Sequence, residues 1–441
     1  MYSKLNINDE LISTAKRNII LNREKIFSPF FLAVEDFIKD NNLIIGGDCA
    51  NLMILDTHGD EINILYHIYS EEPKEDAIEL STKLFNLDPN GIARYINVHT
   101  KIPNNIYQIT INNYICCILY KVPIHKGIQI EKLIECQSLN GIKNKNIKLL
   151  CMGNYIQLIN LYRDINDPNN SSNWEANLIN ERIIRKKYLN SIQCEVREKH
   201  NHINIDMGFL YKEFICNSDM VVIGDASLYI LKHKEATYKS LRKFRLQLIS
   251  TSDLESKGKK LSILGKKHNI DIQWVISYPK YIEDYNLKRL TAMVIIEGKK
   301  KTILDIFNYG EYSLIGYNSI QFNPEKHKSH NTIKYGSIFI TMRFMLLEEW
   351  IFKFLAELKS INEHMLDLMI NNIQCNYILL SEILEGLWEE ERLVEYIYNL
   401  EYIGIHRDTK IELKRKASKM VNQFSTYYPL KPKENILLST K

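Results

Sequence analysis

A short pattern that occurs twice limits the fold of this chain more than any other feature. Residues 43–55 read LIIGGDCANLMIL, and residues 220–231 read MVVIGDASLYIL. Each copy has an apolar run suited to a strand, a Gly-Asp turn and an apolar run suited to the start of a helix. A repeated supersecondary pattern is typical of a duplicated unit. The sequence therefore predicts two copies of one α/β module.

The length and composition of the chain agree with several globular domains. Its 441 residues exceed what one hydrophobic core usually holds. A net charge of +4 permits a nucleic-acid partner but does not require one. The charged N-terminus lacks the apolar core of a signal peptide, and charged residues interrupt the most apolar stretch, residues 337–358. We therefore expect a protein without a membrane segment.

The cysteines and histidines do not form a recognisable metal site. The eight cysteines include no Cys-x-x-Cys pair, so we expect reduced thiols rather than a zinc ribbon or a redox motif. His327 and His330 have no third ligand nearby, which favours an ordinary polar loop. The P-loop and His-Glu-x-x-His motifs are both missing from the sequence.

Hydrophobic periodicity predicts an α/β module over residues 31–150. In it, Gly46 and Gly47 close a strand, and Asp48 is a candidate N-cap for the helix that follows. The expected helices span residues 31–40, 50–55 and 74–87, and the expected strands span residues 42–45, 61–69, 107–111 and 114–120.

The second half of the chain predicts a connector, a second module and a helical end. Further helices are expected over residues 155–165, 174–189 and much of 335–400, with strands over 270–277, 292–297 and 301–307. The expected domains are a helical N-terminal segment (1–30), a first module (31–150), a helical connector (151–200), a second module (201–325), C-terminal helices (330–400) and a basic tail (401–441).

A Gly-Gly turn between a strand and a helix suits nucleotidyl transfer. The two glycines let the backbone approach a triphosphate, and a helix N-terminus favours anionic oxygens. The chemistry also needs Asp-x-Asp on a second strand, because alternate residues face the same side and can hold two magnesium ions. A third Asp on a neighbouring strand completes such a site. Alone, the glycine pair is more often a structural turn.

Several segments together resemble the poly(A) polymerase catalytic subunits of poxviruses and other large DNA viruses. They are LIIGGDCANLMIL, HIYSEEPKEDAIEL (67–80), ICCILYKVP (115–123), NYIQLINLYRDINDP (154–168), VVIGDASLYIL, IGYNSIQFNP (315–324) and GSIFITMRFMLLEEWIFKFL (336–355). The resemblance implies an α/β (α+β) fold with two tandem nucleotidyltransferase-like modules, the second degenerate. It also implies helical N-terminal and C-terminal segments.

The resemblance breaks at the metal ligands. The family pattern resembles Asp-x-Asp-Ile-Tyr-Ser, whereas this chain places Leu65 and His67 at the two Asp positions. A shifted register, which follows Asp60, would instead place Glu61 and Asn63 there. The third family Asp corresponds to Cys117. In neither register do two carboxylates alternate, so no catalytic residue is assigned.

Two interpretations remain open from the sequence. In the first, the chain is a pseudoenzyme with a retained fold, whose Gly46, Gly47 and Asp48 are the candidate nucleotide-binding residues. In the second, it is an active polynucleotide adenylyltransferase that uses Asp60 and Glu61, with Asn63 as a further candidate, together with Mg²⁺ and ATP. A third and weaker alternative is an unrelated α/β binding protein.

By resemblance, the expected partners are RNA and a second polymerase subunit. The candidate RNA-binding side chains fall in two basic clusters: Arg182, Arg185, Lys186 and Lys187, and Arg242, Lys243 and Arg245. Further clusters occur over residues 257–267 and 299–301, and for each cluster a solvated surface is the alternative. We expect a homodimer, or a heterodimer with an active poly(A) polymerase subunit, in the host cytoplasm, the viral factory or the virion, with no DNA or membrane partner.

Overall fold

The computed structural model separates the chain into two compact units. The first comprises residues 1–153 and 411–441, and the second comprises residues 154–410. The structure describes residues 26–47, 65–102, 106–121, 132–137, 146–166, 168, 174–192, 194, 208–242, 244–277, 288–296, 298–308, 315–322, 331–357, 363–403, 425–427 and 438–439.

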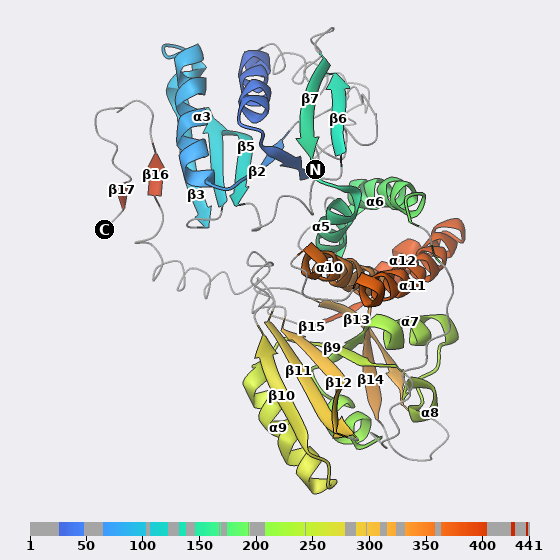
Figure 1. Ribbon diagram of the computed structural model, residues 1–441. Coiled ribbons are helices and arrows are strands. Elements are labelled where there is room, and N and C mark those ends of the chain that lie inside the picture. The colour runs from blue at the N-terminus through green and yellow to red at the C-terminus, as the bar shows by residue number, and fades with distance from the viewer. Residues whose placement is uncertain are drawn as a thin grey trace, which may run out of the picture. The chain divides into compact units, whose positions relative to one another are not determined.

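The first unit is built on a mixed sheet with the strand order β17-β16-β3-β4-β5-β2-β1-β7-β6. Figure 1 shows α3 and the dark-blue helix over residues 26–40 beside these strands. The elements are β1 (Ile44–Gly46), β2 (Tyr66–Ser70), α3 (Pro73–Leu87), η1 (Ile92–Tyr95), β3 (Ile96–Ile102), β4 (Ile106–Ile111), β5 (Tyr114–Lys121), β6 (Lys132–Gln137), β7 (Asn146–Cys151), β16 (Ser425–Tyr427) and β17 (Leu438–Ser439).

The two α-helices described in the first unit, α3 and the helix over residues 26–40, pack on one face of its sheet. Ala77, Leu80 and Leu84 recur at helical spacing along α3 and are fully buried. From the other helix, Phe31 contacts Tyr66 of β2, and the Tyr66 hydroxyl donates a hydrogen bond of 2.7 Å to Glu35. The resulting core covers one side of β2.

The second unit contains a sheet with the strand order β10-β11-β12-β9-β8-β14-β13-β15 and a group of helices (Figure 1). Its elements are α5 (Asn154–Asn166), α6 (Trp174–Leu189), η3 (Leu210–Ile215), β8 (Val221–Ile223), α7 (Gly224–His233), α8 (Tyr238–Leu241), β9 (Leu246–Ser250), α9 (Leu254–Lys267), β10 (Ile272–Ser277), β11 (Lys288–Ile296), β12 (Lys299–Asn308), β13 (Ile315–Gln321), β14 (Thr332–Gly336), α10 (Ile338–Glu357), α11 (Glu363–Glu389), α12 (Leu393–Tyr398) and β15 (Glu401–Ile403).

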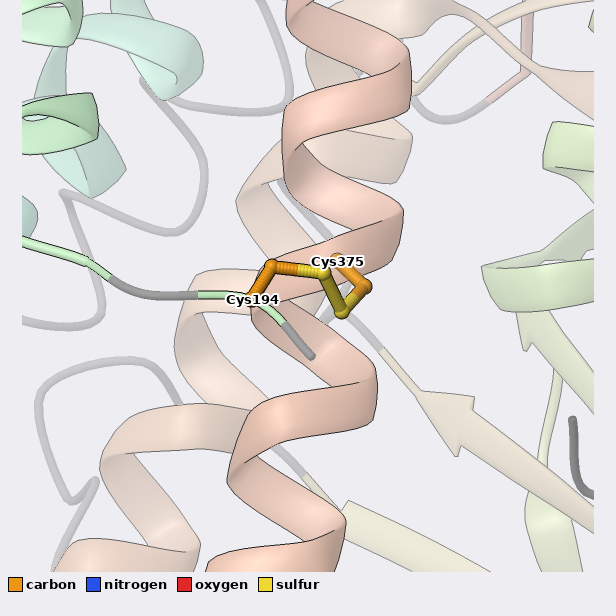
Figure 2. Close-up of a disulfide and its surroundings, with 2 residues drawn as sticks. All are labelled: Cys194 and Cys375. Carbon is orange, nitrogen blue, oxygen red and sulfur yellow. A yellow bond between two sulfur atoms is a disulfide. The ribbon is translucent and has the colours of Figure 1, made fainter. Parts of the chain in front are cut away.

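A disulfide joins two distant segments of the second unit. Cys194, which follows α6, is bonded to Cys375 of α11, with Cα atoms 5.2 Å apart (Figure 2). The expectation of reduced thiols is therefore wrong for this pair. Because 181 residues separate the two cysteines, sequence spacing could not pair them. Cys116 and Cys216 are buried free thiols, and Cys117 and Cys151 are buried as well.

The predicted duplication of the α/β module is confirmed by the topology of the two sheets. Seven strands follow the order β3-β4-β5-β2-β1-β7-β6 in the first sheet and β10-β11-β12-β9-β8-β14-β13 in the second. Each neighbouring pair has the same parallel or antiparallel sense in both sheets. We call the strands β1–β7 with their helices the first module, and β8–β14 with theirs the second module.

Several elements differ from the sequence-based expectation. The helix over residues 26–40 begins before the expected start at residue 31 and crosses the expected boundary at residue 30. Tyr335, expected in a helix, lies in β14. Beyond residue 400, where we expected a basic tail, β15 pairs with β13 and β16 pairs with β3. None of the helices in the described part of the chain has the length and hydropathy needed to cross a membrane.

Candidate active site

The Gly-Gly turn of the first module packs directly against aromatic rings. β1 runs antiparallel to β2, with Gly46 opposite His67, and Gly47 follows with φ +63°. A Cβ added at Gly47 would lie 2.7 Å from the His67 ring, and one added at Gly46 would lie 2.7 Å from the Tyr69 ring. Glycine is needed here both for the backbone conformation and for the close approach.

The rings that meet the turn come from the face of β2 opposite the core. Tyr66, Ile68 and Ser70 are buried, whereas His67 and Tyr69 are half-buried and point to the other side. β5 runs parallel to β2 and places Ile118 beside His67 and Tyr120 beside Tyr69.

Three of these side chains form one stack. The His67 and Tyr120 rings are stacked with centroids 5.6 Å apart, and the Tyr69 and Tyr120 rings are stacked at 5.1 Å. His67 Nδ1 and the Tyr120 hydroxyl are hydrogen-bonded at 3.0 Å. We call His67, Tyr69 and Tyr120 the ring stack. Aromatic rings, and not carboxylates, therefore occupy the strand positions that face the Gly-Gly turn.

The structure separates the three positions at which the resemblance expects metal ligands. His67 faces the turn, and Leu65 lies two residues earlier, just before β2. Cys117, by contrast, is fully buried in the core beside Tyr66. The register of β4 and β5 shifts next to this point, and both Cys116 and Cys117 turn inward. Ile118, rather than Cys117, is therefore the β5 residue beside His67.

The described residues of this site do not fit a pair of magnesium ions. Leu65 and Ile118 offer no ligand atoms, and His67 Nδ1 already has a tyrosine partner. Among the residues that the structure describes, no group of three or more His, Cys, Asp or Glu side chains could hold a metal. Asp48, Asp60, Glu61 and Asn63, which include the alternative register, lie outside the described residues.

The second module has different residues at the same topological positions. Gly224, with φ +65°, matches Gly47, and Gln247 matches His67, since a Cβ at Gly224 would overlap the Gln247 amide oxygen. The parallel pairing of β12 with β9 puts Asp305 beside Gln247, where the first module has Ile118. Arg245, two residues before Gln247, matches Leu65.

Asp305 is fully buried and is neutralised by two arginines. Arg289 Nε donates to its Oδ1 at 2.8 Å, and the Thr291 hydroxyl donates to the same oxygen at 2.7 Å. Arg245 pairs with the other carboxylate oxygen, Oδ2. A carboxylate occupied in this way is a poor ligand for a metal, because the arginines already satisfy its charge.

A pocket lies against this second position. Gly224, Gln247, Arg289, Phe307 and Glu348 are among the residues that line it. The Gln247 amide donates to both carboxylate oxygens of Glu348 on α10 at 3.0 Å. The polar groups of the pocket are therefore largely occupied by one another.

The first predicted RNA-binding cluster belongs to an ion-pair network inside the second unit. Glu385 of α11 accepts hydrogen bonds from Arg182 at 2.9 Å and Arg185 at 3.0 Å, and pairs with Lys186 at 3.0 Å. Hydrogen bonds from Arg182, with support from Lys186 and Arg185, lower the pKa of Glu385 to about 2. Arg185 is only 1% exposed and also binds Glu181. Arg185 therefore holds α6 against α11 and does not face solvent.

The other predicted RNA-binding residues are scattered. Lys187 and Arg242 are exposed, on α6 and at the end of α8. Arg245 pairs with Asp305, and Lys243 lies outside the described residues. Within the described residues, the structure does not bring these side chains together into one surface.

Several residues of the two sites were missed in the sequence. Tyr69, Ile118 and Tyr120 were quoted only as parts of longer segments, and none was considered as a site residue. Alternation from His67 along β2 could have indicated Tyr69. Asp305 is a charged residue inside the apolar run of β12, and this position could have indicated that it forms a buried ion pair.

Comparison with known proteins finds relatives of similar length among uncharacterized viral proteins. No family model matches the chain. An uncharacterized protein of African swine fever virus, from a Malawi isolate, is 24% identical over 412 residues, which cover 91% of this chain and 92% of that protein. Uncharacterized proteins from South African and Namibian isolates are 24% identical over 453 residues, covering 98% of this chain and 99% of each relative.

A solved structure matches nearly the whole chain. The crystal structure of the Megavirus polyadenylate synthase aligns with a TM-score of 0.65 and 15% sequence identity, and covers 99% of this chain and 88% of that one. The identity is too low to transfer residue roles, but the agreement in fold extends over both units. The chain therefore shares its fold with a viral poly(A) polymerase.

Proposed function

We propose that this chain acts in the 3′ polyadenylation of viral mRNA as a catalytically degenerate, RNA-binding or partner subunit. The observation that carries the proposal is the ring stack. It lies against Gly46 and Gly47, where nucleotidyl transfer would require carboxylates that hold magnesium. The shared fold with a viral polyadenylate synthase supports the process, and the viral relatives support the setting.

The chemistry of the described site argues against efficient catalysis. Two-metal sites stabilise the attacking and leaving oxygens by several kcal/mol, and each ~1.4 kcal/mol that is lost slows a reaction about tenfold. Leu65 and Ile118 cannot supply any part of that stabilisation. We infer that Mg²⁺ and ATP are dispensable for the role of this chain, which consists of binding RNA, a second copy or an active polymerase subunit. The proposed setting is the host cytoplasm, the viral factory or the virion.

A primer-extension assay tests this proposal. The purified chain is incubated with an oligo(A)-ended RNA, ATP and either Mg²⁺ or Mn²⁺, beside an active poly(A) polymerase as positive control. We expect no extension, together with RNA binding that fluorescence anisotropy detects.

Two outcomes would overturn the proposal. Extension that disappears in Glu61→Ala but persists in Glu71→Ala would identify a working polymerase that uses the alternative register. A chain that neither extends nor binds RNA, and forms no complex with itself or an active polymerase in native mass spectrometry, would have no role in polyadenylation.

A further inference from the structure

The β11–β12 hairpin of the second module carries a dense group of exposed lysines. Gly298, with φ +74°, lies in the turn, and β12 then begins with Lys299, Lys300 and Lys301, all exposed. By strand alternation, Lys299 and Lys301 face one side of the sheet and Lys300 faces the other. Three charges therefore surround one tip of the module.

A fourth lysine comes from α9 at the same end of the module. Lys266 is exposed in the last turn of α9, and its neighbour Gly265 packs on Ile272, the first residue of β10. Ile272 pairs with Val294 of β11, which in turn pairs with Lys301. Adjacent strands are about 4.8 Å apart, so Ile272 and Lys301 are about 10 Å apart across the sheet. We call Lys266, Lys299, Lys300 and Lys301 the lysine tip.

The lysine tip differs from the other basic clusters in how its charges are compensated. Arg182, Arg185 and Lys186 share Glu385, and Arg245 binds Asp305. Along α9 itself, the paired lysines are Lys257 with Asp219, Lys259 with Glu255 and Lys267 with Glu213. Within the described residues, the lysine tip forms no ion pair. Its ammonium groups therefore keep their charge uncompensated within the described residues and can attract a polyanion.

The surroundings of the tip suit an extended, flexible polyanion. Two acidic residues are described close to the tip along the chain. Asp305 is buried and paired with Arg245 and Arg289, and Asp271 accepts a hydrogen bond from Gln273. Glu297, two residues before Lys299, lies outside the described residues. Ile295, which pairs with Lys300, is 50% exposed and offers an apolar surface beside the charges. Lysines bind phosphates as flexible point charges and do not select a base.

We propose that the lysine tip binds the phosphate backbone of single-stranded RNA. This inference rests on the proposed function, because it locates the RNA contact of that same role. It assigns the RNA contact to the lysine tip and not to the Arg182–Lys187 cluster, in which Arg182, Arg185 and Lys186 hold α6 against α11 through Glu385.

The test measures the binding of fluorescein-labelled oligo(A) RNA by anisotropy at several salt concentrations. The variant Lys299→Ala/Lys300→Ala/Lys301→Ala removes three phosphate contacts. Since each contact with a single strand contributes about 0.7 to the salt slope, the slope should fall by about 2, which weakens binding about 100-fold at 0.1 M salt. The charge-preserving variant Lys299→Arg/Lys300→Arg/Lys301→Arg should bind RNA with the original slope.

A matched control removes the same charge elsewhere. The variant Lys232→Ala/Lys239→Ala/Lys259→Ala replaces three exposed lysines of α7, α8 and α9 that lie outside the lysine tip. It should reduce the affinity less than fivefold. Circular dichroism and thermal unfolding verify that every variant is folded.

The outcomes separate this inference from the proposed function. If the tip variant binds RNA as tightly as the wild type, or if the control variant loses as much affinity, the assignment of RNA binding to the lysine tip is overturned. Either outcome leaves an RNA-binding role of the chain intact. A wild-type chain that does not bind RNA would overturn the lysine tip, and would overturn the proposed function as well if the chain also forms no complex with itself or with an active polymerase. Displacement of RNA by poly-glutamate at equal charge concentration would show a surface for acidic proteins instead, and would overturn the assignment to RNA.

Discussion

The two modules place unlike residues at matching positions of the same fold. In the first, the glycine turn meets the ring stack, and the neighbouring strand contributes Ile118. In the second, the equivalent turn meets Gln247, and the neighbouring strand contributes Asp305, held by Arg245 and Arg289. Within the described residues, one position is occupied by aromatic packing and the other by ion pairs.

The difference shows that the shared topology is independent of the chemistry at the strand ends. The first position needs no charge, and its rings remain half-buried. The second keeps a buried carboxylate, whose desolvation must be offset by its arginine partners. We therefore expect mutations at matching positions to have very different costs in the two modules.

The largest expected effect comes from Asp305. The substitution Asp305→Ala leaves two arginines without their shared carboxylate. Both are about 30% exposed, so they can partly reach solvent, and we expect a loss of about 3 kcal/mol in the free energy of unfolding. Urea denaturation measures this loss.

A double variant provides the control for Asp305. Arg245→Leu/Asp305→Ile copies the residues of the first module at both positions, and should recover at least half of the lost stability. A double variant as unstable as the single one would show that Arg245 is not the source of the effect and would leave Arg289 as its source.

A smaller effect is expected at the two glycines of the turns. Gly47→Ala and Gly224→Ala each force a side chain into the left-handed region, which costs about 1–2 kcal/mol. In the first module the new Cβ also meets the rigid His67 ring, so Gly47→Ala should be the more destabilising substitution. Thermal unfolding of both variants measures the difference. Removing the ring in Gly47→Ala/His67→Ala should reduce the penalty, and an unchanged penalty would contradict the contact.

The metal interpretation can be tested by returning carboxylates to the first module. His67→Asp/Ile118→Asp puts two acids side by side on β2 and β5. Their repulsion should destabilise the variant without metal. Mg²⁺ at ten times its dissociation constant should then raise the free energy of unfolding by about 1.4 kcal/mol. Calorimetry with and without Mg²⁺ measures this. Equal stabilisation of the wild-type chain would mean that it already binds magnesium.

The sequence predicted the modules well because local patterns determine them. The strand–Gly-Asp–helix repeat led to β1, β8 and α7, and helical spacing located α3, α5 and α6 closely. The orientation of Cys117 could not be predicted, because the register shift between β4 and β5 changes the alternation at this point.

Contacts between segments that are distant along the chain could not be predicted from the sequence. Arg182 appeared as part of a basic surface, but its partner Glu385 is 203 residues away. In the same way, no local signal pairs Asp305 with Arg245, or Cys194 with Cys375. The sequence therefore shows which residues are charged or reactive, whereas only the fold shows which of them form ion pairs or a disulfide with one another.

The smallest expected effect distinguishes the hydrogen bond of the ring stack from its packing. Tyr120 matches Phe307 of the second module, because each lies in the same register on the strand parallel to β2 or β9. Tyr120→Phe keeps the ring but removes the hydroxyl that bonds His67 Nδ1. Since the pair is half-buried and water can replace the hydroxyl, we expect a loss of about 0.5–1 kcal/mol in urea denaturation. Tyr120→Ala, which removes the ring as well, should cost at least twice as much. Equal losses in the two variants would assign the stability of the stack to its hydrogen bond. In that case the second module, which has Phe307 at this position and therefore no hydroxyl, would be stabilised there by a different kind of contact.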